Sequence, residues 1–474
     1  MLSPLLTEIL FVVLILSAIT IVVLENHEPM KTLAWVMVVL FLPVVGLVIY
    51  FLFGKNFRSR RIISSSDLQK LSECCDHSED VDPRCGLLSP MQSNLALLAK
   101  AANSAPLQKA NEVTFYTEFS DMFPALLRDI ENARHHIHVL FYIIEDDPVG
   151  RQLAELLVRK AREGVEVRLM FDSAGNLGVR SRFYNDMRLG GVEVVSFLRF
   201  WRSIVTRDVN CRNHRKVVVV DGAVGYSGGM NIAERYQRGI KVGTWRDTHT
   251  RITGPAVSQL QVAFLADWHF ATKQLLCSPS YFPLQPVLPK FQSVVQVVTA
   301  GPMDRWNTVM QCMLQIIAQS RQYLYLQSPY FMPTEPLRVA LCNAALSGVD
   351  VRIMMPLSAD RGKLIHWASH SYLDNVMEAG VKVYFYEKGY LHAKTMVCDD
   401  VVATVGSTNL DSRSLEQNFE VNTFFYGEQE VVRLRKIFEQ DIVDSRVVDP
   451  MVWSNRPVMK RIFESVARLS APLL

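Results

Sequence analysis

The chain has 474 residues, of which 49% are hydrophobic and 20% are charged, with a formal net charge of +3. This length exceeds that of one ordinary domain, so the sequence predicts two folded units with additional segments. The small net charge lacks the strong basic excess of a nucleic-acid-binding protein, and we expect no nucleic-acid partner.

Eight cysteines are scattered along the chain. Such usage favours a reducing compartment over a disulfide-bonded framework. One dense group combines Cys74, Cys75, His77 and Cys85. Adjacent cysteines without a second C-x-x-C pair match no ordinary zinc spacing, so we predict no metal site, and the sequence indicates no cofactor.

Residues 1–61 are predicted to form a two-helix transmembrane hairpin. Residues 32–53 are uncharged, and at ~1.5 Å per residue they are long enough to cross a hydrocarbon core of roughly 30 Å. Pro43 lies inside this segment and is tolerable in a bilayer helix. The first segment, residues 9–24, is also uncharged but reaches spanning length only when residues 5–8 are added. A cleaved signal peptide is the alternative, yet the start has no basic region and no small-residue cleavage site.

Charges beside these segments predict their orientation. The intervening residues 25–31 are acidic apart from Lys31, whereas a basic cluster follows the second segment. The cluster consists of Lys55, Arg58, Arg60 and Arg61. Because cytoplasmic flanks carry the excess of Lys and Arg, we expect everything after residue 55 to lie in the cytoplasm. The same cations would contact anionic headgroups.

Residues 62–111 predict a polar, irregular linker with one short helix near residues 95–101. From residue 112 an alternation of helices and strands occurs twice; R-E-G-V-E-V-R-L-M-F-D at 162–172 aligns with L-S-G-V-D-V-R-I-M-M-P at 346–356. This pattern predicts an α/β fold with a mainly parallel sheet covered on both faces. We expect two related halves, 112–285 and 286–474, packed about a pseudo-two-fold axis, with their boundary in the proline-rich residues 277–290.

Two stretches carry one shared polar pattern. Residues 213–231 read N-H-R-K-V-V-V-V-D-G-A-V-G-Y-S-G-G-M-N, and residues 391–409 read L-H-A-K-T-M-V-C-D-D-V-V-A-T-V-G-S-T-N. A single His-x-Lys beside a valine run is typical of an edge strand with a polar face, but two copies with matching downstream spacing indicate a site. The shared positions are His214, Lys216, Asp221 and Asn231 in the first copy, and His392, Lys394, Asp399 and Asn409 in the second.

This pair resembles the duplicated H-x-K-x4-D signature of the phospholipase D superfamily. Together with the predicted hairpin and the ending R-L-S-A-P-L-L at 468–474, the chain is similar to the bacterial cardiolipin synthases of that superfamily, over nearly its whole length. The resemblance implies a phosphatidyltransferase in the bacterial cytoplasmic membrane, with its catalytic part on the cytoplasmic side. The implied partners are phosphatidylglycerol and an anionic phospholipid membrane; the oligomeric state is left open.

The side chains of the two copies suit phosphodiester exchange without a metal. Lys216 and Lys394, aided by Asn231, Ser407 and Asn409, would neutralise the phosphate oxygens. One neutral imidazole would attack phosphorus to form a phosphohistidine. The other, initially protonated, would protonate the leaving alkoxide and then deprotonate the incoming hydroxyl. The resemblance implies that His214 is the nucleophile and His392 the acid–base; the residues alone do not choose between them.

An imidazole nucleophile also needs its second nitrogen held in place. The resemblance implies an acidic residue downstream of each copy, matched by Glu420 for the second copy and, at looser spacing, by Asp247 for the first. The predicted reaction joins two phosphatidylglycerol molecules into cardiolipin and glycerol. A hydrolase using water, a transferase using another alcohol, and a non-catalytic membrane scaffold are the alternatives; two intact signatures argue against the scaffold.

Two further segments are candidates for contact with lipid. Residues 197–210 mix Phe200 and Trp201 with arginines, which suits either an anionic headgroup with an apolar tail or a solvated insertion. Residues 458–469 place four apolar side chains on one helical face. These are Met459, Ile462, Val466 and Leu469. That face predicts either a membrane-interface helix or, preferred here, packing into the core.

Overall fold

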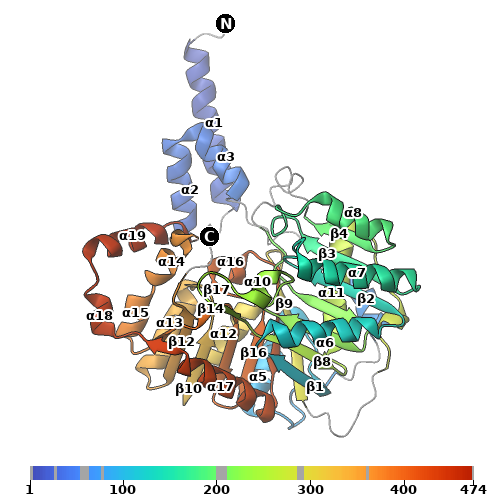
Figure 1. Ribbon diagram of the computed structural model, residues 1–474. Helices are drawn as coiled ribbons and strands as arrows, with labels where there is room; N and C mark the ends of the chain where they lie inside the picture. Colours follow the sequence, from blue (N-terminus) through green and yellow to red (C-terminus); the bar gives the residue numbers. More distant parts are fainter. Residues whose placement is uncertain are drawn as a thin grey trace.

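The computed structural model describes residues 4–25, 29–53, 63–75, 80–198, 211–284, 293–358 and 362–471. An α/β body carries a projection of three helices at its N-terminal end (Figure 1). Several predictions concern residues outside these ranges. They are the basic cluster at 55–61, His77, most of the 197–210 segment and part of the predicted boundary at 277–290.

Both halves of the body repeat one order of elements. The first half contains β1 (Gln108–Tyr116), α6 (Phe119–Glu131), β2 (His136–Phe141), α7 (Pro148–Arg162), β3 (Glu166–Asp172), α8 (Ser181–Leu189), β4 (Glu193–Phe197), β5 (Val217–Val220), β6 (Val224–Gly228), α10 (Glu234–Arg238), β7 (Thr244–Arg246), β8 (His249–Thr253) and α11 (Val257–Thr272).

The second half follows the same course and adds C-terminal helices. It contains β9 (Ser293–Ala300), α12 (Thr308–Gln319), β10 (Tyr323–Gln327), β11 (Phe331–Met332), α13 (Glu335–Leu346), β12 (Asp350–Pro356), α14 (Lys363–His370), α15 (Leu373–Glu378), β13 (Lys382–Tyr386), β14 (Gly389–Leu391), β15 (Thr395–Cys398), β16 (Val402–Gly406), β17 (Leu410–Asp411), α16 (Ser412–Glu416), β18 (Glu420–Phe425), α17 (Glu428–Val443), β19 (Ser445–Val447), α18 (Pro450–Ser454) and α19 (Val458–Arg468).

One continuous sheet runs through both halves. Its order is β19, β13, β12, β10, β15, β16, β18, β9, β1, β8, β6, β5, β2, β3, β4, so the halves mirror each other about the antiparallel β1–β9 pair. The expected mainly parallel sheet is wrong. Among the described strands of this sheet, only β2, β3, β4 and their counterparts β10, β12, β13 pair in parallel. Strands β5 and β6 are joined by a three-residue turn, which only antiparallel neighbours allow.

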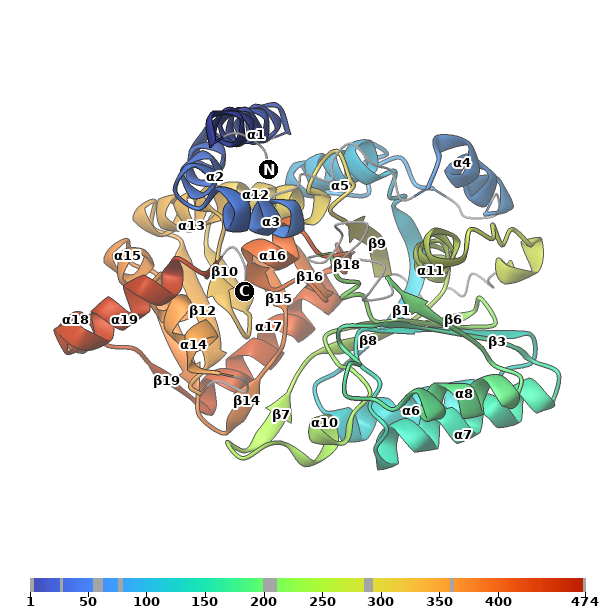
Figure 2. The same ribbon diagram turned by 90° about the horizontal axis from the view of Figure 1, so that it is seen from above.

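Helices cover both faces of this sheet, as predicted. Figure 2 shows α6, α7 and α8 along one face of the first half and α11 on the opposite face. A separate apolar core lies under the outer helices of each half. A third core is shared, because buried residues of α11 and α17 pack there with strands of both halves. The halves are therefore joined by a common hydrophobic interior as well as by strand pairing.

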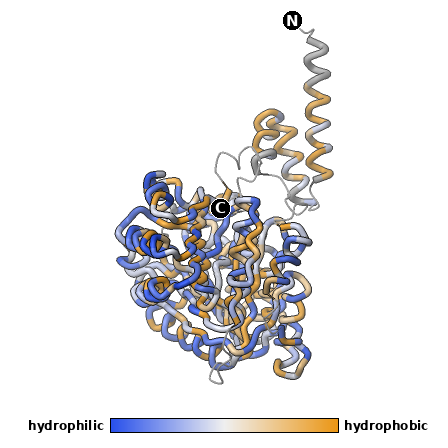
Figure 3. The backbone as a smooth tube through the Cα atoms, turned by 90° about the vertical axis from the view of Figure 1, so that its right-hand side faces the viewer, coloured by the Kyte–Doolittle hydropathy of each residue, from blue (hydrophilic) through white to orange (hydrophobic). Residues whose placement is uncertain are grey.

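The projection consists of α1 (Pro4–Glu25), α2 (Pro29–Phe41) and α3 (Pro43–Phe53), and Figure 3 shows mainly hydrophobic residues along it. The single helix predicted over 32–53 is wrong, because α3 folds back on α2 at Pro43. The rings of Trp35 and Tyr50 meet edge to face with centroids 5.4 Å apart. A Cβ on Gly46 would lie 2.6 Å from the Val38 carbonyl oxygen, so glycine permits the close approach. Proline starts the new direction because its ring conflicts with a continuing helix.

The described helices include none that pairs the length with the apolar character required for a membrane crossing.

The segment predicted as an irregular linker is largely ordered. It contains α4 (Ser65–Cys74), α5 (Pro90–Asn103) and the start of β1. Ser89 and Gln92 form a reciprocal capping box, and Pro90 begins the helix, which explains why α5 starts there. The Gln92 amide also donates to the Tyr426 carbonyl at 2.8 Å. This segment therefore packs onto the second half instead of spacing it from the membrane.

Cys74 and Cys277 form a disulfide, which corrects the expectation of cysteines without disulfides. The two Cα atoms lie 6.2 Å apart although 203 positions separate the residues along the chain. Sequence spacing carries no signal for such a distant pair, which forms where α4 packs near α11. In the described residues, no group of three or more His, Cys, Asp or Glu side chains is arranged to hold a metal ion.

Candidate active site

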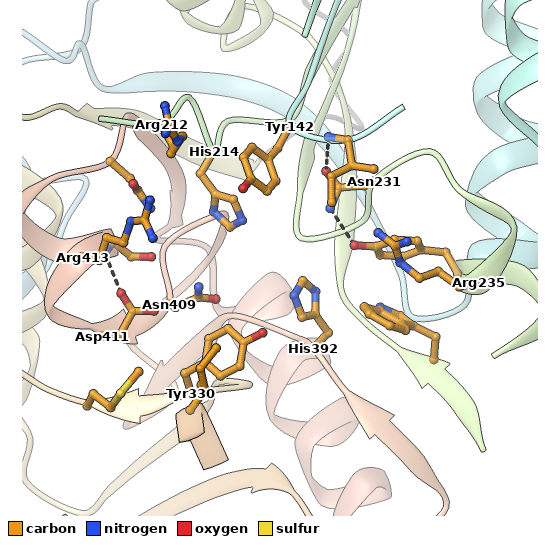
Figure 4. Close-up of a pocket in the computed structure, with 17 residues that line it drawn as sticks. Tyr142, Arg212, His214, Asn231, Arg235, Tyr330, His392, Asn409, Asp411 and Arg413 are labelled. Atoms are coloured by element: carbon orange, nitrogen blue, oxygen red, sulfur yellow. Dashed lines mark hydrogen bonds between the residues drawn. The ribbon is translucent and has the colours of Figure 1, made fainter. Parts of the chain in front are cut away.

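His214 and His392 both face one cavity of about 200 Å3 between the two halves (Figure 4). His214 lies just before β5, and His392 directly follows β14. Both signature copies thus reach one site, as the duplicated pattern predicts. Aromatic side chains form much of the remaining wall. They are Tyr142, Tyr236, Trp245 and Tyr330.

Each histidine is held through Nδ1 by a buried carboxylate. The His214 Nδ1–H donates to Glu420, whose two carboxylate oxygens each lie 3.1 Å away. The His392 Nδ1–H donates to Asp247 Oδ2 at 2.6 Å. With Nδ1 occupied in this way, Nε2 is the nitrogen of each ring that can react in the cavity.

These carboxylates are exchanged between the halves, which reverses the predicted pairing. Glu420 follows the second signature but holds the first histidine, and Asp247 follows the first signature but holds the second. The backbone explains the exchange. The His214 amide donates to the Phe419 carbonyl at 2.9 Å, and the His392 amide donates to the Arg246 carbonyl at 2.7 Å. Each histidine therefore lies beside the residue that precedes the opposite carboxylate.

The surroundings of the two carboxylates differ. The Ser407 hydroxyl donates to Glu420 Oε2. The corresponding position of the first half is Gly229, where an added Cβ would lie 2.0 Å from Asp247 Oδ1. Burial alone would raise the pKa of Asp247, but Lys394 and His392 outweigh burial and lower it. Lys394 Nζ is 4.0 Å from Asp247 Oδ2.

Burial also controls the protonation of the other groups. It lowers the pKa of His214, although Glu420 opposes the shift, and it lowers the pKa of His392 to about 3. Burial therefore favours the neutral form of both imidazoles. Burial lowers the pKa of Lys216 to about 7. Its ammonium donates to the His214 carbonyl at 2.6 Å.

Comparison with known proteins identifies the family to which this chain belongs. Residues 126–268 and 313–442 match the family model described as cardiolipin synthase, PLD-like domain, and residues 9–55 match the phospholipase D-nuclease N-terminal family. The chain is 37% identical to a cardiolipin synthase of Geobacillus kaustophilus (strain HTA426), over 98% of this chain and 92% of that protein. It is 36% identical to the major cardiolipin synthase ClsA of Bacillus subtilis (strain 168), over 100% and 99% of the two chains.

The chain belongs to the cardiolipin synthase family. A solved structure, the phosphatidylserine synthase of Haemophilus influenzae Rd KW20, shares the fold with a TM-score of 0.60. The identity to that protein is 15%, and the match covers 80% of this chain and 98% of the other.

The two aspartates of the family signature lie away from the cavity. Asp221 accepts backbone N–H bonds from Arg134, His135 and His136 at 2.8–2.9 Å. Asp399 accepts the equivalent three bonds from residues 321–323. The predicted catalytic role for these aspartates does not fit this placement. Five positions along an extended strand cover roughly 16 Å, so Asp221 must lie at the far end of β5 from Lys216.

The predicted polar partners in this cardiolipin synthase site divide into two groups. Asn231 and Asn409 line the cavity. The Asn231 amide accepts from the Ile143 N–H at 3.1 Å and donates to the Tyr236 hydroxyl at 2.6 Å, which fixes its orientation (Figure 4). Ser407 acts through Glu420, as described above, and does not line the cavity.

Sequence reasoning missed Arg215, the residue between His214 and Lys216. Its guanidinium donates to Asp267 at 2.6 Å, to the Glu420 carbonyl at 3.0 Å and to the Ala300 carbonyl at 3.1 Å. It therefore connects the first signature to the strand that carries Glu420. The available signal was an arginine between His214 and Lys216, where the second copy has Ala393. The cavity arginines Arg212, Arg235 and Arg413 were also missed.

Proposed function

We propose that this chain makes cardiolipin by transferring a phosphatidyl group from one phosphatidylglycerol molecule to another. One observation supports this most: two histidines meet in one cavity, and each donates its Nδ1–H to a buried carboxylate. That arrangement leaves two Nε2 atoms for two different tasks, covalent attack and proton transfer. No further reactive group is required.

In the first step, His214 Nε2 attacks phosphorus and the bond from phosphorus to the glycerol headgroup oxygen breaks. The glycerol leaves with a proton from His392 Nε2. In the second step, a hydroxyl of the second phosphatidylglycerol gives its proton to His392 and attacks phosphorus, and the phosphorus–nitrogen bond breaks. A phosphodiester anion beside His392 favours the imidazolium form required for the first step. We assign His214 as nucleophile by resemblance to the superfamily.

The charge of the transferring group would be met by Lys216 and Lys394, with Asn231 and Asn409 as amide donors. Both lysines are buried next to the histidine backbone, so their charges act in a poorly hydrated region. Cations aimed at a phosphoryl group are effective in such surroundings because water does not screen them. The low pKa of Lys216 makes its charge sensitive to pH near neutrality.

We also propose that residues 1–61 anchor the chain in the bacterial cytoplasmic membrane, with the body in the cytoplasm. Apolar side chains of the projection are widely exposed, including Leu24 at 72% and Phe41 at 71%. Exposed apolar surface of this extent is typical of lipid contact. Reporter fusions test the orientation: a cytoplasm-dependent reporter after residue 474 should be active, and activity of a periplasm-dependent reporter there would overturn it.

For the domain organisation we propose a connecting segment at 62–107, followed by halves at 108–285 and 286–474, because β1 begins at Gln108. Limited proteolysis of the purified protein tests this division. Cleavage should concentrate in the proline-rich boundary at 277–290, and efficient cleavage inside either half would argue against the boundaries.

Product analysis tests the reaction. Purified full-length protein in phosphatidylglycerol vesicles should release about one glycerol per cardiolipin formed, with little phosphatidic acid. Water at ~55 M competes for the phosphohistidine unless the cavity excludes it, so the product ratio measures that exclusion. Phosphatidic acid as the main product would make the chain a hydrolase. A phosphatidyl ester of an added alcohol as the main product would indicate a different acceptor. The His214→Ala protein is the matched control.

A further inference from the structure

The C-terminal helix α19 presents its apolar side outward. Ile462 is 48% exposed, Val466 60% and Leu469 80%. The opposite side, with Glu464 and Ala467, is buried against the body. This corrects the preferred prediction that the apolar face packs into the core. In the described part of the chain, no element covers that face.

The contacts of the inner side explain this orientation. Ala467 packs with Ala368 of α14 and with Met332. The carboxylate of Glu464 accepts from Arg456 at 2.9 Å, and Phe463 stacks on Trp367 with ring centroids 5.8 Å apart. Small, polar and aromatic side chains thus attach the helix, while its bulky aliphatic side chains are left for another surface. Core helices of soluble proteins show the reverse arrangement.

Position and charge indicate which surface that is. Figure 1 shows α19 at the same end of the body as the projecting helices α1–α3. The helix also carries three exposed cations, Lys460, Arg461 and Arg468, which helical spacing places on the side opposite the apolar face. An interfacial helix carries its cations in this way, because they reach lipid phosphates while the aliphatic side chains enter the acyl region.

The helix is also connected to the cavity. Its inner residues Ala467 and Ala471 belong to a small cluster with Met332, Tyr330 and Ile365, and these last three line the active-site cavity. Any surface that binds the outer face of α19 is therefore held next to the rim of the cavity.

We propose that α19 lies in the headgroup–acyl boundary of an anionic bilayer and holds the rim of the cavity against the lipid from which the substrates come. This goes beyond the proposed function, since an N-terminal anchor by itself would keep the body near a membrane without fixing which face of the body meets the lipid. A second copy of this chain would also cover an apolar face, but the exposed cations of the same helix favour lipid phosphate.

Depth-dependent quenching tests the location directly. The full-length protein, with the exposed Cys85 replaced by Ser, carries a fluorophore on Ile462→Cys in vesicles of phosphatidylglycerol and phosphatidylcholine. Glu439→Cys on α17, at the opposite end of the body, is the matched control. A quencher on the lipid acyl chain should reduce the emission at 462 at least about twofold and leave 439 unchanged, given insertion of ~5–10 Å. Equal quenching at both positions would overturn the proposal. A blue shift at 462 that depends on protein density without lipid quenching would assign the face to a second copy.

A paired variant tests the consequence for catalysis. Ile462→Asn with Val466→Asn should lower turnover of phosphatidylglycerol in bilayers about tenfold relative to turnover of a water-soluble, short-chain phosphatidylglycerol. Ser465→Asn, on the flank of the same helix, should leave that ratio unchanged. An unchanged ratio in the paired variant would contradict the role of α19. Quenching does not depend on which product forms, so failure of cardiolipin synthesis and failure of this inference are distinguishable.

Discussion

The first and second signature copies share a backbone plan but differ in how each histidine is held. His214 donates a hydrogen bond to Glu420, which also accepts one from the Ser407 hydroxyl. His392 bonds a shorter aspartate at 2.6 Å, with a glycine where the other half has the serine. A duplicated fold thus supplies two imidazoles in related positions, and the carboxylates give them different surroundings. The comparison indicates that division of work between the histidines depends on their partners as well as on the signature itself.

Replacing either histidine tests whether the two copies have different tasks. His214→Ala and His392→Ala should each lower turnover by about 10³-fold or more, because covalent attack and proton transfer fail separately. Rapid acid quenching with labelled phosphatidylglycerol distinguishes them. Label should accumulate on His214 in the His392→Ala protein and be absent from the His214→Ala protein. Label on His392 in the latter would reverse the assignment.

Removing the charge of each carboxylate tests the exchanged pairing. Glu420→Gln and Asp247→Asn should each slow turnover about 10–100-fold, because an amide stabilises an imidazolium poorly and permits the wrong tautomer. Glu420→Gln should slow formation of the labelled histidine. Asp247→Asn should slow formation of the label, because glycerol leaves in the same step with a proton from His392, and should also slow resolution of the label. If the two variants exchanged these effects, each carboxylate would serve the histidine of its own half.

Gly229 and Ser407 allow a smaller comparison between the halves. Gly229→Ala places a Cβ within 2.0 Å of Asp247 Oδ1 and must displace that carboxylate, so we expect an activity loss of about tenfold. Ser407→Ala removes one hydrogen bond to Glu420, and a loss of about threefold should follow. Thermal unfolding of both variants checks that the fold is intact. A larger activity loss in Ser407→Ala than in Gly229→Ala would contradict this ranking of the two contacts.

The pH dependence of activity sharpens the comparison of the lysines. The pKa of Lys216 is lowered to about 7, so its charge is present below that pH and lost above it. We therefore expect kcat/KM to fall as pH rises through about 7, approaching tenfold per pH unit. Lys216→Arg should remove this decline because the guanidinium stays charged. Lys394→Arg should keep the decline, and a profile unchanged by Lys216→Arg would assign it to another group.

Local features of the fold followed from sequence more readily than contacts between distant segments. The repeats at 162–172 and 346–356 do contain β3 and β12, because apolar alternation reports local burial. The exchange of Glu420 and Asp247 between the two histidines could not be predicted from the sequence, since it depends on how the two halves pack against each other. The same holds for the Cys74–Cys277 disulfide. The return of α3 onto α2 was misjudged because proline was treated as tolerable within a continuing helix.

The outward orientation of the apolar face of α19 was not predicted, for a related reason. An apolar stripe at helical spacing is the same pattern whether its partner is protein or lipid. Packing into protein and contact with lipid are distinguished here by the opposite side of the helix, where Glu464 accepts a hydrogen bond from Arg456 of the body. Asp221 and Asp399 were assigned a catalytic role because they belong to the motif, but they accept backbone hydrogen bonds away from the cavity. A sequence motif thus includes residues that build a turn as well as residues that react.

The exchanged carboxylates have a consequence for a chain still being synthesised. The N-terminal half leaves the ribosome first, with His214 but without Glu420, which lies 206 positions further on. Until the second half has folded against it, neither imidazole has its partner, and a nascent or prematurely terminated chain cannot form a phosphohistidine efficiently. Synthesis as far as Glu420, and folding of the second half, must therefore precede the holding of His214 for attack on phosphorus.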